Sequence, residues 1–172
     1  VAVSVARHGF SHILIVNGHG SNQSICDLAA RKCVLATGVI CAATTVNAAV
    51  NPALVADALD AERKGGFGSV GHACEYETAM MLHLHPDLVQ MDKAYRDIGQ
   101  LKLKYFNWDH PEPSAYAWQD WWSRFSKEGI CGDASAATPE FGRRMFELTV
   151  ERFVEMVREF QTIEIRPRVD HH

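Results

Sequence analysis

Histidine and carboxylate side chains that could do chemistry stand at two turns of the chain. The first turn is Asn17-Gly18-His19-Gly20, which directly follows four apolar residues, 13–16. Glycines on both sides of His19 allow a tight turn and a close approach of a ligand to the backbone. We therefore expect His19 to bind a metal ion or to transfer a proton, with Asn17 holding its ring by a second hydrogen bond. The loop amides would suit an anion equally well.

The second turn is Gly71-His72-Ala73-Cys74, which leads into Glu75 and Glu77. His72 stands just before a predicted helix, and both glutamates fall in its first turn, where the helix dipole favours negative charge. On an ideal helix His72 shares a face with Glu75, whereas Glu77 points elsewhere. From spacing alone either glutamate could serve the site, and both could simply cap the helix.

The elements around the first turn predict an α/β fold. The apolar run 13–16 reads as a buried strand, and Ser21 and Asn22 are good helix-capping residues. A helix is expected from about 22 to 37, ended by Gly38, and a second strand over 39–46. Strand, helix and strand in this order form a right-handed unit with parallel strands. We expect three layers, a mostly parallel sheet flanked by helices.

The rest of the chain gives further elements. Residues 1–7 read as the end of a helix, 51–64 as a helix-like segment, 75–84 as a helix, 88–91 as a short strand and 129–133 as a turn. A long helix is expected from Thr138, with Pro139 at its first position. The four tryptophans lie in the segment 95–128, for which packing of aromatic rings onto the body is the preferred interpretation and ligand stacking the alternative.

Composition narrows the function classes. The 172 residues are 47% apolar and 22% charged, which predicts one globular domain over 1–161 followed by a tail, 162–172. A net charge of -4 without a basic stripe argues against nucleic acid. No apolar run approaches the roughly 18 residues of a membrane helix. The five cysteines are odd in number and contain no CxxC, which indicates reduced thiols and a cytoplasmic location.

Both motifs together resemble the creatininase (creatinine amidohydrolase) family. The resemblance rests on the order and spacing of several segments and runs from Val1 to about Phe160. These segments are Arg7-His8-Gly9-Phe10, residues 13–22, residues 72–82, residues 85–89, Gly132-Asp133 and Ala137-Thr138.

The resemblance implies a metal-dependent hydrolase that cleaves amide, cyclic amide or formamide C–N bonds of a small molecule by attack of a metal-bound hydroxide. It implies two divalent ions of zinc, manganese or iron per complete site, and a homo-oligomer, usually a hexamer. By motif, His19 and Glu77 become metal ligands and His72 the catalytic proton-transfer group. The remaining candidates, supporting or close to substrate, are Asn17, Gly18, Gly20, Ser21, Asn22 and Glu75.

The chain also departs from the family pattern. The family's other ligands, a Glu-x-His and a following Asp, precede the region that this chain resembles, so we expect an N-terminal part to be missing and residues 1–172 alone to be inactive. Ser21 stands where creatininase has a glutamate, which argues against creatinine as substrate. Cys74 replaces a glycine and is expected to crowd the turn beside His72. The alternative function is a non-catalytic α/β binding or assembly module whose Gly-His-Gly loop holds an anion.

Overall fold

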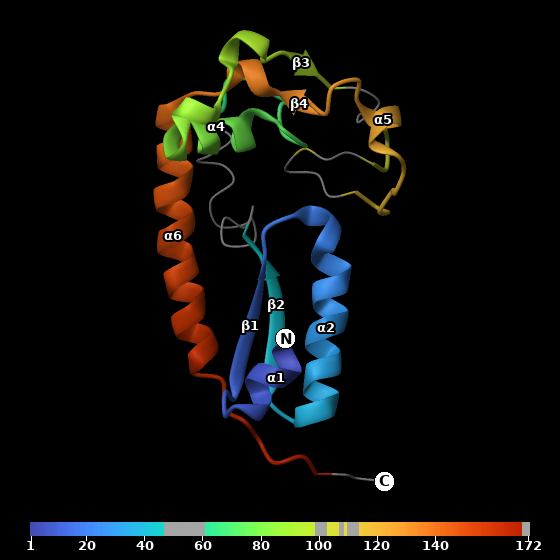
Figure 1. Ribbon diagram of the computed structural model, residues 1–172, viewed down its shortest axis with the longest axis vertical. Coiled ribbons are helices and arrows are strands. Elements are labelled where there is room, and N and C mark those ends of the chain that lie inside the picture. The colour runs from blue at the N-terminus through green and yellow to red at the C-terminus, as the bar shows by residue number, and fades with distance from the viewer. Residues whose placement is uncertain (47–60, 99–102, 107–108, 110–113, 170–172) are drawn as a thin grey trace. The chain divides into compact units, whose positions relative to one another are not determined.

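The computed structural model describes residues 1–46, 61–98, 103–106, 109 and 114–169 (Figure 1). The chain divides into two compact units. Unit 1 comprises residues 1–50 and 149–172, and unit 2 comprises residues 51–148. The expectation of a single domain over 1–161, with a tail over 162–172, stays a prediction.

Unit 1 is built on a strand–helix–strand motif. Strand β1 (His12–Asn17) pairs in parallel with β2 (Ile40–Thr45), and the register places His12 opposite Ile40 and Asn17 opposite Thr45. Helix α2 (Gln23–Thr37) connects them and ends at Gly38, whose φ of 75° is the left-handed conformation that glycine adopts most easily. The predicted parallel unit is therefore confirmed, with boundaries shifted by one residue at most.

Two further elements flank this motif within unit 1. Helix α1 (Ala2–Arg7) precedes β1, as predicted. After α6 (Pro139–Gln161) ends, the chain from 162 to 169 has no regular secondary structure. His12 Nε2 lies 2.7 Å from the carbonyl oxygen of Ile163, and the rings of His12 and Phe160 pack edge to face at 5.9 Å. These contacts tie the start of the final segment to β1.

Unit 2 packs helix α4 (Glu75–Leu84) against the first half of α6. The two helices approach closely at Gly142 and Ala79: a Cβ atom on Gly142 would lie 1.8 Å from the carbonyl oxygen of Ala79. The buried side chains around this crossing belong to α4 and to the chain from 134 onward: Ala79, Ala134, Ala137, Phe141, Met145 and Leu148. The crossing is therefore a closely packed part of the unit 2 core.

The remaining elements of unit 2 are short. Strand β3 (Arg96–Asp97) pairs antiparallel with β4 (Gly132–Asp133), and α5 (Trp122–Phe125) lies in the tryptophan-rich segment. Single 3-10 turns are η4 (Pro86–Leu88), η5 (Met91–Lys93) and η6 (Ala134–Ala136). Parallel and antiparallel pairs with helices confirm the α/β class.

Three local predictions need correction. The expected strand over 88–91 is wrong: 3-10 turns occupy both of its ends, and Pro86 begins the first of them. The expected turn over 129–133 contains β4, which sequence reasoning missed because a strand of two residues has no periodicity. The helix-like segment 51–64 lies outside the described residues up to 60, and residues 61–62 are helical.

Two general features agree with the composition. All five cysteines are free. No helix among the described residues combines the length and the apolar character needed to cross a membrane.

Candidate functional site

The first candidate turn leaves β1 at its C-terminal end. Asn17 is 4% exposed, and its Oδ1 accepts a hydrogen bond from the backbone N–H of His19 at 3.0 Å, while its Nδ2 donates to Gln23 Oε1 at 3.2 Å. Asn17 thus fixes the loop through the backbone of His19, whereas we predicted a bond to the ring. The buried amide sets the direction in which the exposed His19 leaves the strand.

Gly18 and Gly20 have ordinary backbone conformations and lie beside open space. Neither has a positive φ, and a Cβ atom on either would meet no atom within 4 Å. His19 itself is extended, with φ -147° and ψ 129°. A side chain at either position would therefore meet open space, and the exposed loop has room beside both glycines.

Ser21 and Asn22 do not cap α2 in the way predicted. Both are exposed and belong to the 3-10 turn η1 (Gly20–Asn22). Asn22 is the N-cap residue, but its φ of -92° and ψ of -7° are helical, and its side chain makes no capping hydrogen bond. A cap side chain reaches back to the helix from an extended backbone. The 3-10 turn removes that geometry.

The second candidate turn is held by an isolated antiparallel bridge. The backbone N–H of His72 donates to the carbonyl of Cys131, and the N–H of Cys131 donates to the carbonyl of His72, both at 2.8 Å. The imidazole of His72 stacks on the indole of Trp122, with ring centroids 4.2 Å apart and planes tilted by 33°. Spacing along the chain does not connect Trp122 with His72, because 50 residues separate them.

We predicted that Cys74 would crowd the turn after His72, but the backbone at Cys74 is relaxed. Cys74 is buried with φ -94° and ψ -172°, an extended conformation that any residue adopts. The residue in the left-handed region is Ala73, with φ 46°. Replacement of a glycine at position 74 therefore does not strain the backbone there, because the sharp bend falls one residue earlier.

Glu75 is a buried anchor of the preceding loop. It is 1% exposed, and its Oε1 and Oε2 accept hydrogen bonds from the backbone N–H groups of Lys64 at 2.6 Å and Gly65 at 2.9 Å. A Cβ atom on Gly65 would lie 2.4 Å from Ser69 Cβ, so this close approach requires glycine. The carboxylate of Glu75 is thereby committed to holding the loop.

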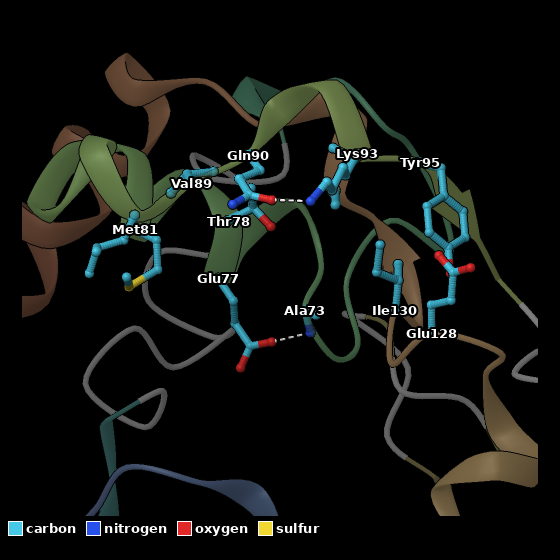
Figure 2. Close-up of a pocket in the computed structure, with 13 residues that line it drawn as sticks. Ala73, Glu77, Thr78, Met81, Val89, Gln90, Lys93, Tyr95, Glu128 and Ile130 are labelled. Atoms are coloured by element: carbon cyan, nitrogen blue, oxygen red, sulfur yellow. Dashed lines mark hydrogen bonds between the residues drawn. The ribbon is translucent and has the colours of Figure 1, made fainter.

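Glu77 is exposed and lines a cavity of about 520 Å³ in unit 2 (Figure 2). One carboxylate oxygen, Oε2, accepts a hydrogen bond from the backbone N–H of Ala73, and the other points away from that turn. Apolar side chains such as Met81, Val89 and Ile130 line the cavity with the polar Lys93 and Glu128. Glu77 thus fixes the turn through one oxygen while its side chain lines the cavity.

A buried ion pair also supports the loop that Glu75 binds. Arg63 and Asp109 have side chains that are 8% and 2% exposed, and Arg63 Nη1 donates to Asp109 Oδ1. The second oxygen of Asp109 accepts a hydrogen bond from the backbone N–H of Gly68. Neither residue belongs to a motif, so no sequence signal predicts this role.

His72 and Glu77 belong to unit 2, and His19 belongs to unit 1. A shared metal site would require these three side chains to lie close together, and that proximity is a prediction. Within the described residues, no three His, Cys, Asp or Glu side chains are grouped closely enough to hold a metal ion together.

Comparison with known protein families covers nearly the whole chain. The family model described as Creatininase: Creatinine amidohydrolase matches residues 1–157. The chain belongs to the creatininase family. The match includes both candidate turns, the His19 loop and the segment from His72 to Glu77.

Solved creatininase structures share the fold. A creatinine amidohydrolase (creatininase) is 24% identical with a TM-score of 0.65, covering 94% of this chain and 61% of its own. A manganese creatininase is 24% identical with a TM-score of 0.62, covering 92% and 60%. A glutamate-to-glutamine mutant of Zn-Zn type is 23% identical with a TM-score of 0.63, covering 92% and 59%.

This chain spans about 60% of the length of the solved structures that it matches. No curated protein sequence matches it significantly. At this level of identity the structures establish the creatininase fold, and the activity is the subject of a proposal.

Proposed function

We propose that this protein is a metal-dependent hydrolase that cleaves amide, cyclic amide or formamide C–N bonds in a small molecule. The observation that carries the proposal is the family match over residues 1–157, which includes an accessible imidazole in one motif and an accessible carboxylate in the other. The matched creatininases include a manganese form and a Zn-Zn form, which supports the proposal that this protein binds a divalent ion. Two ions per complete site is the arrangement we propose.

His19 and Glu77 are the residues that would hold metal. Imidazole nitrogen and carboxylate oxygen are both suitable donors for zinc, manganese and iron. The exposed His19 is oriented through its backbone by buried Asn17, and the Glu77 carboxylate is oriented by Ala73 while it lines the cavity. Such fixed orientation of ligands by neighbouring groups is typical of metal sites.

Bound divalent ions would supply a Lewis acid that polarises the carbonyl group and makes a water molecule a nucleophile near neutral pH. The chain's own contribution to the reaction is proton transfer. His72 is the proposed group, accepting a proton at a ring nitrogen and delivering it to the departing nitrogen of the amide. Its backbone is fixed by the bridge to Cys131, which supports this role.

Glu75 was expected either to support the site or to lie close to substrate, and its contacts favour the supporting role. Both of its oxygens bind loop amides, so we propose that Glu75 acts only through the loop 64–69. Gly18, Gly20, Ser21 and Asn22 remain proposed as residues around the His19 ligand. Their exposure supports access of the substrate from this side of unit 1.

The assembly and location are part of the proposal. Large apolar side chains of α2 are strongly exposed, Ile25 at 69%, Leu28 at 55% and Leu35 at 76%. Exposed apolar residues of this kind support burial between copies of the chain, a homo-oligomer and by family a hexamer. Five free cysteines support a reducing compartment, the cytoplasm.

Metal titration tests the proposal. Zinc or manganese is titrated calorimetrically into the chelator-treated complete gene product and into His19→Asn and Glu77→Gln. We expect each substitution to weaken binding more than about 100-fold, beyond the loss typical of residues that only orient a ligand. The matched controls are His8→Asn and Glu159→Gln, which change the same residue types at exposed positions.

The same preparation is assayed for hydrolysis of creatinine, pyrimidine formamides and small amides. Chelation should abolish turnover of the accepted substrate, and zinc or manganese should restore it. Wild-type metal affinity in both variants would overturn the ligand assignment. A metal-free protein that binds inorganic phosphate at the His19 loop would favour the binding-module alternative.

A further inference from the structure

The aromatic rings of the tryptophan-rich segment form a continuous series that ends on His72. Successive ring centroids along the series lie 5.6, 5.4, 4.9, 5.8 and 4.2 Å apart. We call this series the aromatic ladder; in order, its members are Tyr116, Phe106, Trp118, Phe125, Trp122 and His72. All of them belong to unit 2.

The aromatic ladder rests on the core of the unit. Phe106 is 2% exposed and forms a buried cluster with Cys131, against which Trp118 and Phe125 pack. Cys131 is also the residue whose backbone pairs with His72. The backbone of His72 and the rings that lead to its side chain are therefore anchored on the same buried cluster.

Trp122 contacts His72 through the face of its ring. At a centroid distance of 4.2 Å and a tilt of 33°, the indole covers one side of the imidazole. Rotation of the imidazole about χ2 would sweep its edge against the indole, so the stack restricts the directions of both ring nitrogens. Proton transfer requires a nitrogen within about 2.6–3.2 Å of its partner atom, which makes this restriction useful.

We propose that Trp122 is a positioning residue that holds the imidazole of His72 in its working orientation. The proposal rests on the proposed function, in which His72 transfers the proton. It gives the tryptophan-rich segment a role in the reaction: α5 delivers an aromatic face to a histidine 50 residues earlier in the chain. Trp122 acts through His72 and needs no contact with the substrate.

The first arm of the test measures the stack without any metal or substrate. The C–H resonances of the His72 ring are recorded by NMR in the present chain and assigned with His72→Asn. In the wild type we expect these resonances upfield of ordinary histidine values, because the ring lies over the indole. They should move downfield in Trp122→Ala and stay in place in Trp121→Ala, the control at the adjacent residue, which is 73% exposed.

The second arm measures turnover of the metal-loaded complete gene product. Trp122→Ala should lower kcat about 10- to 100-fold with KM nearly unchanged, since misplacing a reacting group by about an ångström costs this much. Trp122→Phe keeps an aromatic face and should recover most of kcat. Trp121→Ala should match the wild type. A fluorescence or circular dichroism melt confirms that each variant is folded.

The outcomes separate this proposal from the one on which it rests. If the His72 resonances do not move in folded Trp122→Ala, the stacking of Trp122 on His72 is refuted, whatever the turnover measurements give. Moved resonances with wild-type kcat would overturn the positioning role and leave the hydrolase intact. A wild-type protein that neither binds metal nor shows turnover would instead overturn the proposed function, and the positioning role with it.

Discussion

The carboxylate of Glu75 accepts a hydrogen bond from the backbone N–H of Gly65 at 2.9 Å inside unit 2. Its second oxygen binds the N–H of Lys64, and the side chain is 1% exposed. Glu77, two residues further on, is exposed and lines a cavity. Two neighbouring glutamates therefore have different surroundings, one buried against a loop and one exposed at a cavity.

Replacing Glu75 by Gln should destabilise the protein by about 1–3 kcal/mol, the cost of leaving a buried donor unpaired. A carboxamide has a single acceptor oxygen, so its NH₂ group would face one of the two loop N–H groups. Urea unfolding followed by circular dichroism measures the difference. Glu77→Gln is the control and should unfold close to the wild type, because its remaining oxygen can still accept from Ala73. Equal stability of Glu75→Gln and wild type would contradict the anchor.

Replacing Gly142 by Ala tests the crossing of α4 and α6. Alanine gains about 1 kcal/mol of helix propensity over glycine. Its Cβ, however, would lie 1.8 Å from the carbonyl oxygen of Ala79, a backbone atom that cannot rotate away. Overpacking of this kind costs about 3 kcal/mol, so the net loss of stability should be about 2 kcal/mol.

Thermal and urea unfolding of Gly142→Ala measure that loss. Ser24→Ala, at an exposed position of α2, is the control, since it adds helix propensity without a clash and should not destabilise. A Gly142→Ala variant as stable as the wild type would mean that the helices do not approach this closely.

Asp133 predicts a pH dependence of stability. Burial raises the pKa of its carboxyl group, but hydrogen bonds from Ser135 and Arg96 and the charge of Arg96 outweigh burial and hold the pKa below the ordinary 3.8. A carboxylate with a lowered pKa stabilises the folded state above the ordinary pKa, and this stabilisation is lost as the pH falls through the lowered value.

The measurement is the free energy of unfolding at pH 7 and at steps down to about pH 2.5 for wild type and Asp133→Asn. The variant should be less stable at pH 7, and the difference should shrink below about pH 4. Asp87→Asn, at an exposed position, should track the wild type throughout. A difference that stays constant with pH would show that the charge of Asp133 is not involved.

Local sequence signals predicted the regular elements well. The strand–helix–strand motif around α2 and the boundaries of α4 followed from apolar periodicity and from Gly38 and Pro86, which act over a few residues. The short strands β3 and β4 and the 3-10 turns were missed. Elements of two or three residues are too short for periodicity and form only where the surrounding chain provides partners.

The sequence by itself determined the family and the residue types at both turns. His19, His72 and Glu77 stand in motifs whose order and spacing a family model recognises over residues 1–157. It left the functions of Glu75 and Glu77 open, because helical spacing places side chains on faces without saying what those faces meet. The family resemblance chose Glu77 as ligand, and that assignment awaits the metal titration.

Only the tertiary structure decided what each side chain contacts. In the structure Glu75 binds the amides of residues 64 and 65, and the sharp bend lies at Ala73. The indole of Trp122 lies on the imidazole of His72. These contacts join segments 10 to 50 residues apart, and packing of unit 2 brings them together. Hydrogen bonding and ring stacking depend on distances of a few ångströms, which motif spacing along the chain does not fix.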